Sequence, residues 1–304
     1  MCTLKAFQKK IGVNWQLYLL FLPTLAYFLI FQYGPLYGIQ IAFKDFSAVR
    51  GITGSPWIGF EHFERFFGSY QFWTLLYNTI ELSLYGLLVG FPVPIILALL
   101  LNQLGHERFK RFVQTVSYAP HFISTVVLVG MMFVFLSPNS GLLNQIIVAF
   151  GGDPVFFMAR PEWFKTLFVF STVWQSAGWG AIIYLAALAS IDPGLHEAAR
   201  IDGASKLQRI RHIDLPGIMP TIIILFILEI GKLMTVGFEK AYLMQNSLNI
   251  DSSEIIQTYV YKTGLLGAQF SFSTAVGLFD AVINFMILIL FNRLSRRISE
   301  TSLW

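Results

Sequence analysis

The segment IGVNWQLYLLFLPTLAYFLIFQYGPLYGIQIAF, residues 11–43, runs for 33 residues without one Asp, Glu, Lys or Arg. A helix needs about 20 predominantly apolar residues to cross the roughly 30 Å hydrocarbon core of a bilayer. The rest of the chain has a similar character, because 55% of its 304 residues are hydrophobic and only 12% are charged. An average soluble domain is about 25% charged. The composition therefore predicts a multi-pass membrane protein, and it excludes a soluble enzyme, a soluble nucleic-acid-binding protein and a disordered chain.

Six stretches of the chain are long and apolar enough to be membrane spans. We expect them at about residues 15–41, 72–101, 112–136, 166–189, 216–238 and 270–291. Prolines inside or near these spans, and the pair Gly178 and Gly180, favour kinked helices around a cavity. The sequence shows no internal repeat and no separate soluble domain. Residues 1–304 are therefore expected to form a single all-α transmembrane domain.

The distribution of basic residues predicts the orientation of the spans, because Lys and Arg are more frequent in cytoplasmic loops. One basic cluster, Lys5, Lys9 and Lys10, precedes the first span. Further clusters follow the second, fourth and sixth spans, whereas the loops on the other side are longer but carry fewer basic residues. Both termini and the loop 190–215 are therefore expected in the cytoplasm.

An aromatic stripe marks the first outer loop. Phe60, Phe63 and Phe67 recur at helical spacing, and Phe66 lies alongside them in the sequence. A short amphipathic helix can use such a stripe to lie along the outer leaflet of the bilayer. It can equally use the stripe to pack against a partner subunit, and both interpretations stay open.

The loop 190–215 has clear helix signals. Asp192 is a suitable N-cap and Pro193 suits the first helical position, so a short helix is expected from about Pro193 to Asp202. Gly203 follows, where the end of a helix favours a positive φ. A second short helix is expected over residues 204–211, ending before Pro216. Such a hairpin can insert into a groove of a partner protein, and the residues alone are equally compatible with a solvated connector.

One motif in this loop resembles that of a known family. Glu197-Ala198-Ala199, then Gly203 after three residues, then Ile213-x-Leu215-Pro216 after nine more, resembles the EAA motif of the permeases of binding-protein-dependent ABC importers. Its position before the fifth of six spans is similar too. The chain resembles the polysaccharide and oligosaccharide branch of sugar permeases, including the larger maltose permease subunit. Unlike that subunit, this sequence shows no extra N-terminal spans and no large periplasmic insertion. The residues that carry the sugar-permease resemblance are Tyr18 to Asp45, Trp57 to Phe60, Asn78, Thr79 and Ser117 to Ser124.

This resemblance implies a fold, a substrate class and partners. The fold is the type I ABC importer permease fold, also called MetI-like, and the substrate is an oligosaccharide or a polysaccharide-derived sugar. The partners are a second permease subunit in a heterodimer, two ATP-binding subunits, and an extracellular lipoprotein or periplasmic solute-binding protein. The complex would lie in a bacterial cytoplasmic membrane.

By the same resemblance, the loop 190–215 is the coupling element that fits a groove of an ATP-binding subunit. Closure of the ATP-binding pair would then switch the permease between inward-facing and outward-facing states. The residues expected to make this contact are Glu197, Ala198, Ala199, Arg200, Asp202, Gly203 and Lys206.

The sequence contains no motif for catalysis by the chain itself. It has no Gly-rich phosphate loop ending in Lys-Ser or Lys-Thr, no His-Glu-x-x-His, no Cys-x-x-Cys and no nucleophile elbow. We therefore expect a permease without enzyme activity, metal or bound cofactor, whose partner subunits bind ATP and Mg²⁺. Nucleic acid is not an expected partner.

Polar and ionisable residues at membrane depth are the candidates for the substrate path, because charges there are costly and usually face a cavity or a partner. Aromatic faces beside hydrogen-bonding groups also suit a carbohydrate. Glu229 and Lys232 lie three residues apart in the expected fifth span, so they fit either a structural ion pair or a pore lining. The candidates are Asn78, Glu81, Trp174, Gln175, Trp179, Glu229, Lys232, Asp280 and Asn284.

An ion-coupled secondary transporter is the alternative function. That class predicts an inverted repeat with helices broken near the membrane midplane. The sequence shows no convincing repeat, and an ion-coupled transporter would leave the EAA motif unexplained. A membrane-embedded enzyme is a third possibility, but it would need a catalytic cluster that the sequence does not contain.

Overall fold

A computed structural model describes residues 15–298, with side chains described to residue 294. Every regular element in this part of the chain is helical, and one isolated β-bridge joins Lys44 to Trp57. The lysines of the N-terminal cluster, Lys5, Lys9 and Lys10, lie outside the described residues. The chain divides into two compact units, and the single transmembrane domain expected over residues 1–304 stays a prediction. One unit extends to Phe67 and includes Thr263–Leu278, and the other comprises Gly68–Lys262 and the chain from Phe279 onward.

The first unit begins with an apolar helix of 29 residues, Trp15–Phe43. Pro23 and Pro35 lie in this helix and remove two backbone donors, and its geometry changes from α to π and then to 3₁₀ along its length. Its elements are α2 (Trp15–Tyr27), η1 (Phe28–Tyr33) and η2 (Gly34–Phe43), followed by α3 (Gly51–Gly54), α4 (Glu61–Phe67) and the first part of α17 (Phe270–Ile298).

The aromatic stripe of α4 packs within the first unit. The rings of Phe60 and Phe63 each lie 5.4 Å from the ring of Phe43. Phe66 is buried against Phe272, and the guanidinium of Arg65 lies 4.2 Å from the same Phe272 ring. Intramolecular packing therefore accounts for Phe63 and Phe66, which neither the leaflet nor the partner interpretation anticipated.

The second unit holds most of the remaining helices. Its elements are α5 (Gln71–Gly90), α6 (Pro92–Asn102), α7 (Glu107–Tyr118), η3 (Ala119–Phe122), α8 (Thr125–Phe135), α9 (Leu142–Ala149), α10 (Pro161–Ala189), α11 (Pro193–Ile201), α12 (Lys206–Arg209), η4 (Ile210–Asp214), α13 (Leu215–Ile230), α14 (Phe238–Met244), α15 (Ile250–Ser253) and α16 (Ile256–Tyr261). The π-turn η5 (Lys262–Leu266) begins at its boundary. By length and composition, four helices of the described chain are candidate membrane spans, and two bent helix pairs raise the number to as many as six.

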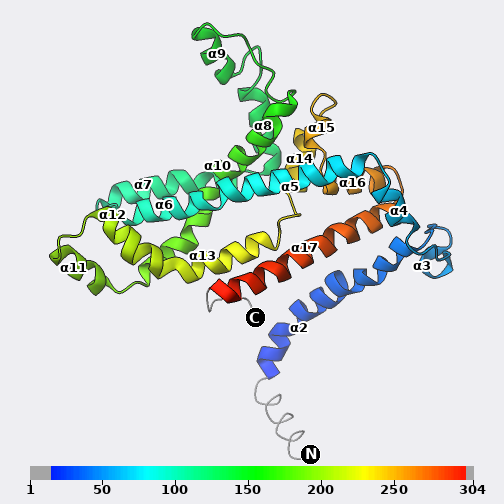
Figure 1. Cartoon of the computed structure of the whole chain (residues 1–304), viewed down its shortest axis with the longest axis horizontal. Helices are drawn as coiled ribbons and strands as arrows, with labels where there is room; N and C mark the ends of the chain where they lie inside the picture. The colour runs from blue at the N-terminus through cyan, green and yellow to red at the C-terminus, as the bar shows by residue number, and fades with distance from the viewer. Residues whose placement is uncertain (1–14, 299–304) are drawn as a thin grey trace, which may run out of the picture. The chain divides into compact units, whose positions relative to one another are not determined.

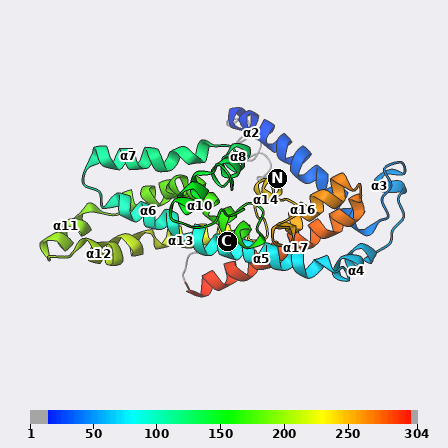
Figure 2. The same ribbon diagram turned by 90° about the horizontal axis from the view of Figure 1, so that it is seen from above.

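The central helix of the second unit is α10. It packs against α5, α6, α7, α13 and α14 (Figures 1 and 2). A glycine at position 178 allows the close approach to α7, because a Cβ there would collide with the backbone carbonyl of Ser117. The buried core runs along α10 in two clusters, one around Phe164 and Phe168 and the other around Ala181 and Tyr184.

Two of the expected spans differ from the helices observed. The third is broken between η3 and α8, where the helix axis turns by 101° and Ser124 caps the new helix. The fifth was expected over 216–238, but α13 ends at Ile230. At its other end α13 continues without a break from Lys206, because the π-turn η4 leads directly into it and Pro216 lies just after the change from π to α geometry. The second helix of the hairpin is thus the end of the fifth span itself.

Candidate functional site

The hairpin of loop 190–215 has the expected local geometry. The Asp192 carboxylate accepts a hydrogen bond from the backbone N–H of Gly194 at 2.9 Å and caps α11. Gly203 has a φ of +77°, the left-handed conformation that favours glycine. Ser205 and Gln208 form a capping box that begins α12. Local hydrogen bonds and one glycine therefore set the shape of this hairpin.

The hairpin protrudes at one end of the second unit, near the end of α6 (Figure 1). Of the residues predicted to contact an ATP-binding subunit, Ala199 is half-buried and the others are exposed. The hairpin also exposes apolar side chains that the sequence analysis missed, and the most exposed are Ile201 at 87% and Leu207 at 73%. Exposed apolar groups on a protruding element are typical of an interaction surface. Large apolar residues within a charged, polar loop were the signal that pointed to them.

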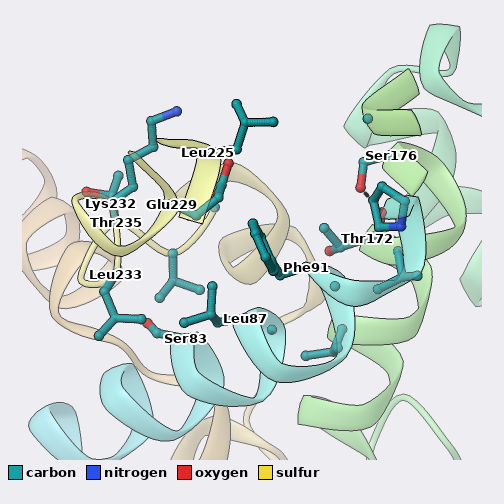
Figure 3. A pocket seen from close by; sticks show the side chains of 18 of the residues that line it. Ser83, Leu87, Phe91, Thr172, Ser176, Leu225, Glu229, Lys232, Leu233 and Thr235 are labelled. Atoms are coloured by element: carbon teal, nitrogen blue, oxygen red, sulfur yellow. Dashed lines mark hydrogen bonds between the residues drawn. The ribbon is translucent and has the colours of Figure 1, made fainter. Parts of the chain in front are cut away.

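A cavity of about 430 Å³ lies between α5, α10 and the end of α13. Of the predicted path residues, Trp179, Glu229 and Lys232 line it. Trp179 is stacked on His121 of η3, with ring centroids 4.5 Å apart and planes 4° from parallel. Figure 3 shows Thr172 and Ser176 on one wall and Leu225 and Glu229 on another, with the Phe91 ring between them.

Hydroxyl groups supply much of the remaining polarity of the cavity wall, and the sequence analysis missed them. Thr172, Ser176 and Gly180 recur every fourth residue of α10, which places them on one helix face. Such a row of small and polar residues in an apolar span was the available signal. The hydroxyl side chains that line the cavity are Ser83, Thr172, Ser176, Tyr184 and Thr235.

Glu229 and Lys232 do not form the ion pair that their spacing allowed. The described side chains contain no ion pair between them, although both line the cavity. The pairing rule requires one continuous helix, and α13 ends at Ile230, before Lys232 is reached. Both charges therefore remain available to the cavity.

Two other candidates for the path are engaged elsewhere in the second unit. The buried Asn78 amide donates to the backbone carbonyls of Asp251 and Glu254 at 2.8 and 3.1 Å, so it holds the segment at α15. Glu81 forms an ion pair with Lys165. Neither residue lines the cavity.

The remaining four candidates also lie outside the cavity lining. The Gln175 amide donates to the Ile123 carbonyl at 2.7 Å, at the break between η3 and α8. Trp174 lines a second, largely apolar pocket of about 380 Å³ between α8 and α10. Asn284 accepts from the backbone N–H of Met234 at 3.0 Å and thereby supports the turn after α13. Asp280 is partly buried in α17.

Behind the cavity wall lies Lys240, a buried cation that the sequence analysis did not single out. Its side chain is 6% exposed, and its ammonium donates to the Phe168 carbonyl at 3.1 Å and to Thr172 Oγ1 at 2.8 Å. Both partners line the cavity. No carboxylate pairs with Lys240 among the described residues. Burial lowers the pKa of Lys240 to about 7.

Comparison with known proteins places the chain in a family. Residues 90–300 match the family model of the binding-protein-dependent transport system inner membrane component. The polygalacturonan/rhamnogalacturonan transport system permease protein YteP of Bacillus subtilis is 47% identical over 288 residues, which cover 95% of this chain and 90% of that protein. Protein LplB of the same organism is 42% identical over 301 residues, covering 96% and 95% of the two chains.

Two solved structures share this fold along nearly its whole length. A chain of a bacterial ABC transporter that imports the acidic polysaccharide alginate superposes with a TM-score of 0.90 at 42% identity, covering 97% of this chain and 99% of that one. A chain of the alginate transporter in complex with an alginate pentasaccharide-bound periplasmic protein superposes with a TM-score of 0.89 at 41% identity, with the same coverage. The chain therefore belongs to the family of binding-protein-dependent transport system inner membrane components, and it is a multi-pass permease subunit of an ABC importer whose ATPase activity resides on separate subunits.

Proposed function

We propose that this permease subunit carries acidic oligosaccharides, built from uronic acid units, from a solute-binding protein across the membrane. The observation that carries the proposal is the similarity along almost the whole chain to two transport systems for uronate polymers. These are the polygalacturonan/rhamnogalacturonan permease at 47% identity and the alginate transporter at 42%. Each uronic acid unit of such a polymer presents a carboxylate as well as hydroxyl groups.

The chemistry of the cavity supports this substrate class. Its volume of about 430 Å³ lies in the range of small-molecule sites. The rings of Phe91 and Trp179 offer flat apolar surface for the C–H faces of a sugar, and the hydroxyl side chains match its hydroxyl groups. Lys232 supplies positive charge for carboxylates in the wall, where Glu229 is the acidic group, and Lys240 lies behind the wall bonded to Thr172.

The hairpin provides the link to ATP in this proposal. It faces the cytoplasm and fits a groove of one ATP-binding subunit, through the contact residues from Glu197 to Lys206 and the exposed Ile201 and Leu207. ATP and Mg²⁺ bind to the partner subunits. A second permease subunit completes the translocation path, and closure of the ATP-binding pair drives the change of access.

Transport by the reconstituted complex tests the proposal. Proteoliposomes would contain this chain, its partner permease and the ATP-binding subunits, with the solute-binding protein added outside and ATP enclosed. We expect ATP-dependent uptake of a trigalacturonate and little uptake of its methyl ester, which has the same sugar units without the charges. Preferential uptake of the ester would contradict the acidic substrate class. Uptake driven by an ion gradient without ATP would instead support a secondary transporter.

A further inference from the structure

The base of the hairpin contains a carboxylate on which three elements of the second unit converge. We propose that Asp214 transmits the movement of the coupling hairpin to the second and fifth spans, because its side chain joins α11 to the end of α6. The inference rests on the proposed docking of this hairpin to an ATP-binding subunit. The EAA motif leaves this position unspecified, since Asp214 is the variable residue between Ile213 and Leu215.

Each oxygen of Asp214 has its own partners. Oδ1 lies 3.2 Å from His196 Nε2 of α11 and accepts from Asn102 Nδ2 at 3.4 Å. Oδ2 accepts from Gln103 Nε2 at 2.8 Å, and Arg209 adds a nearby positive charge. These side chains come from the first helix of the hairpin, from the end of α6 and from the helix that contains Asp214.

Complete burial makes these contacts hard to break. Asp214 has an exposed fraction of 0%, so its protein partners rather than bulk water satisfy its carboxylate in this conformation. Removing one partner from a buried charge leaves that charge uncompensated, which is strongly unfavourable. His196 and the end of α6 are therefore expected to follow Asp214 when the hairpin is displaced, rather than slide past it.

The backbone alone connects the two hairpin helices weakly. After α11 the chain passes through Gly203 with its φ of +77°, a residue that readily changes conformation. The contact between His196 and Asp214 bridges this hinge. Asp214 itself belongs to the continuous helix Lys206–Ile230, so a push on α11 is delivered directly to the fifth span.

The helices held by Asp214 also form the walls of the cavity. Leu225 and Glu229 of α13 line it, and so do Phe91 and Pro94 at the start of α6. A displacement at the hairpin therefore reaches two cavity walls along packed helices, which are the kind of contiguous element that carries coupling between distant sites. The structure thus assigns Asp214 and His196 as positioning residues for the coupling of ATP hydrolysis to transport.

The test compares substitutions at the two partners in the reconstituted complex. The variants are His196→Ala, His196→Gln and Asp214→Asn, and the control is His212→Gln, an exposed histidine of the same segment. For each we would measure the sugar transported per ATP hydrolysed and the amount of ATP-binding subunit that co-purifies. The ratio reports coupling, which a simple loss of folded complex does not change.

We expect His196→Ala and Asp214→Asn to retain the ATP-binding subunits but to transport about fivefold less sugar per ATP, in the range found for residues along a coupling path. His196→Gln should recover most of the ratio, because its amide can donate to Asp214. His212→Gln should match the unmodified complex.

An unchanged ratio in His196→Ala would overturn the inference, as would losses of assembly and transport in equal proportion. If Asp214→Asn fails to assemble, the two His196 variants decide the question. The two proposals fail in different ways. A wild-type complex without ATP-dependent uptake contradicts the proposed function, whereas a normal wild-type complex with unchanged variants contradicts only the role of Asp214.

Discussion

The hairpin and the cavity are the two candidate functional regions of the second unit, and they are built in opposite ways. The hairpin is one continuous segment whose caps join residues two or three positions apart. The cavity is lined by residues from Leu82 to Gly237, carried by separate helices. The first region was therefore readable from a short motif. The second depended on where each helix ends and which face it turns inward.

The largest effect is expected from a substitution at Gly203, which should disrupt the hairpin and leave the cavity intact. Proline restricts φ to about −65°, so Gly203→Pro is incompatible with the observed φ of +77° and should reorient the two hairpin helices. We expect co-purification of the ATP-binding subunits to be lost and transport to fall to background. The control is Gly59→Ala, at a φ of +67° in the first unit, which should retain the ATP-binding subunits. Normal association and transport in Gly203→Pro would refute the docking assignment.

A substitution at Ser176 should have the opposite signature. The side chain of Ser176 lines the cavity, so Ser176→Phe would fill space that a sugar needs. Transport should be strongly reduced while the ATP-binding subunits remain bound, because the hairpin is untouched. Ser176→Ala is the matched control: it removes the hydroxyl without filling the cavity, and it should lower transport far less than Ser176→Phe does. Full transport by Ser176→Phe, measured as uptake into proteoliposomes, would show that substrate bypasses this cavity.

The charged residues of the cavity should affect which sugar is transported more than the total rate of transport. Lys232→Gln removes a cation from the wall, and we expect the preference for trigalacturonate over its methyl ester to fall by about tenfold, the size of one hydrogen bond to a charged group. Glu229→Gln should raise the preference, since it removes the acidic group that repels carboxylates. Competition between the two sugars for uptake measures both effects. Equal preferences in the two variants would contradict a role for these charges.

The smallest expected effect concerns Lys240 and pH. Its pKa of about 7 in the folded protein lies below the usual lysine value, which is about 10.4. Between these values the unfolded chain binds more protons, so the free energy of unfolding should rise with pH from about 7 to about 10.4. Lys240→Met should weaken this rise in the thermal unfolding midpoint between pH 7 and pH 9.5.

A second lysine provides the control for this measurement. Lys110→Met, on α7, should keep the pH dependence of the unmodified protein. If Lys240→Met and the unmodified protein respond identically to pH, the buried lysine does not titrate in this range.

Sequence-based prediction succeeded where a residue's partners are close to it in the chain and failed where they are far away in the chain. Asp192 as a cap and Gly203 as a positive-φ hinge were predicted because their partners are immediate neighbours in the chain. Among the path candidates, Trp179 lines the cavity, whereas the Asn78 amide bonds to carbonyls more than 170 positions away. Both residues are polar or aromatic groups at membrane depth, so the sequence cannot distinguish them. Only the long-range contacts of the folded chain show that Trp179 lines the cavity and Asn78 does not.

By itself the sequence determined the membrane-helical class, the number and approximate places of the apolar segments, and the motif that resembles ABC importer permeases. These follow from hydropathy and local spacing, which do not depend on the fold. The tertiary structure decided that α13 stops at Ile230, that Lys240 is buried behind the cavity wall, and that Asp214 joins the hairpin to α6. Those features arise where distant helices pack together, and burial then determines which polar groups are paired and which face the cavity.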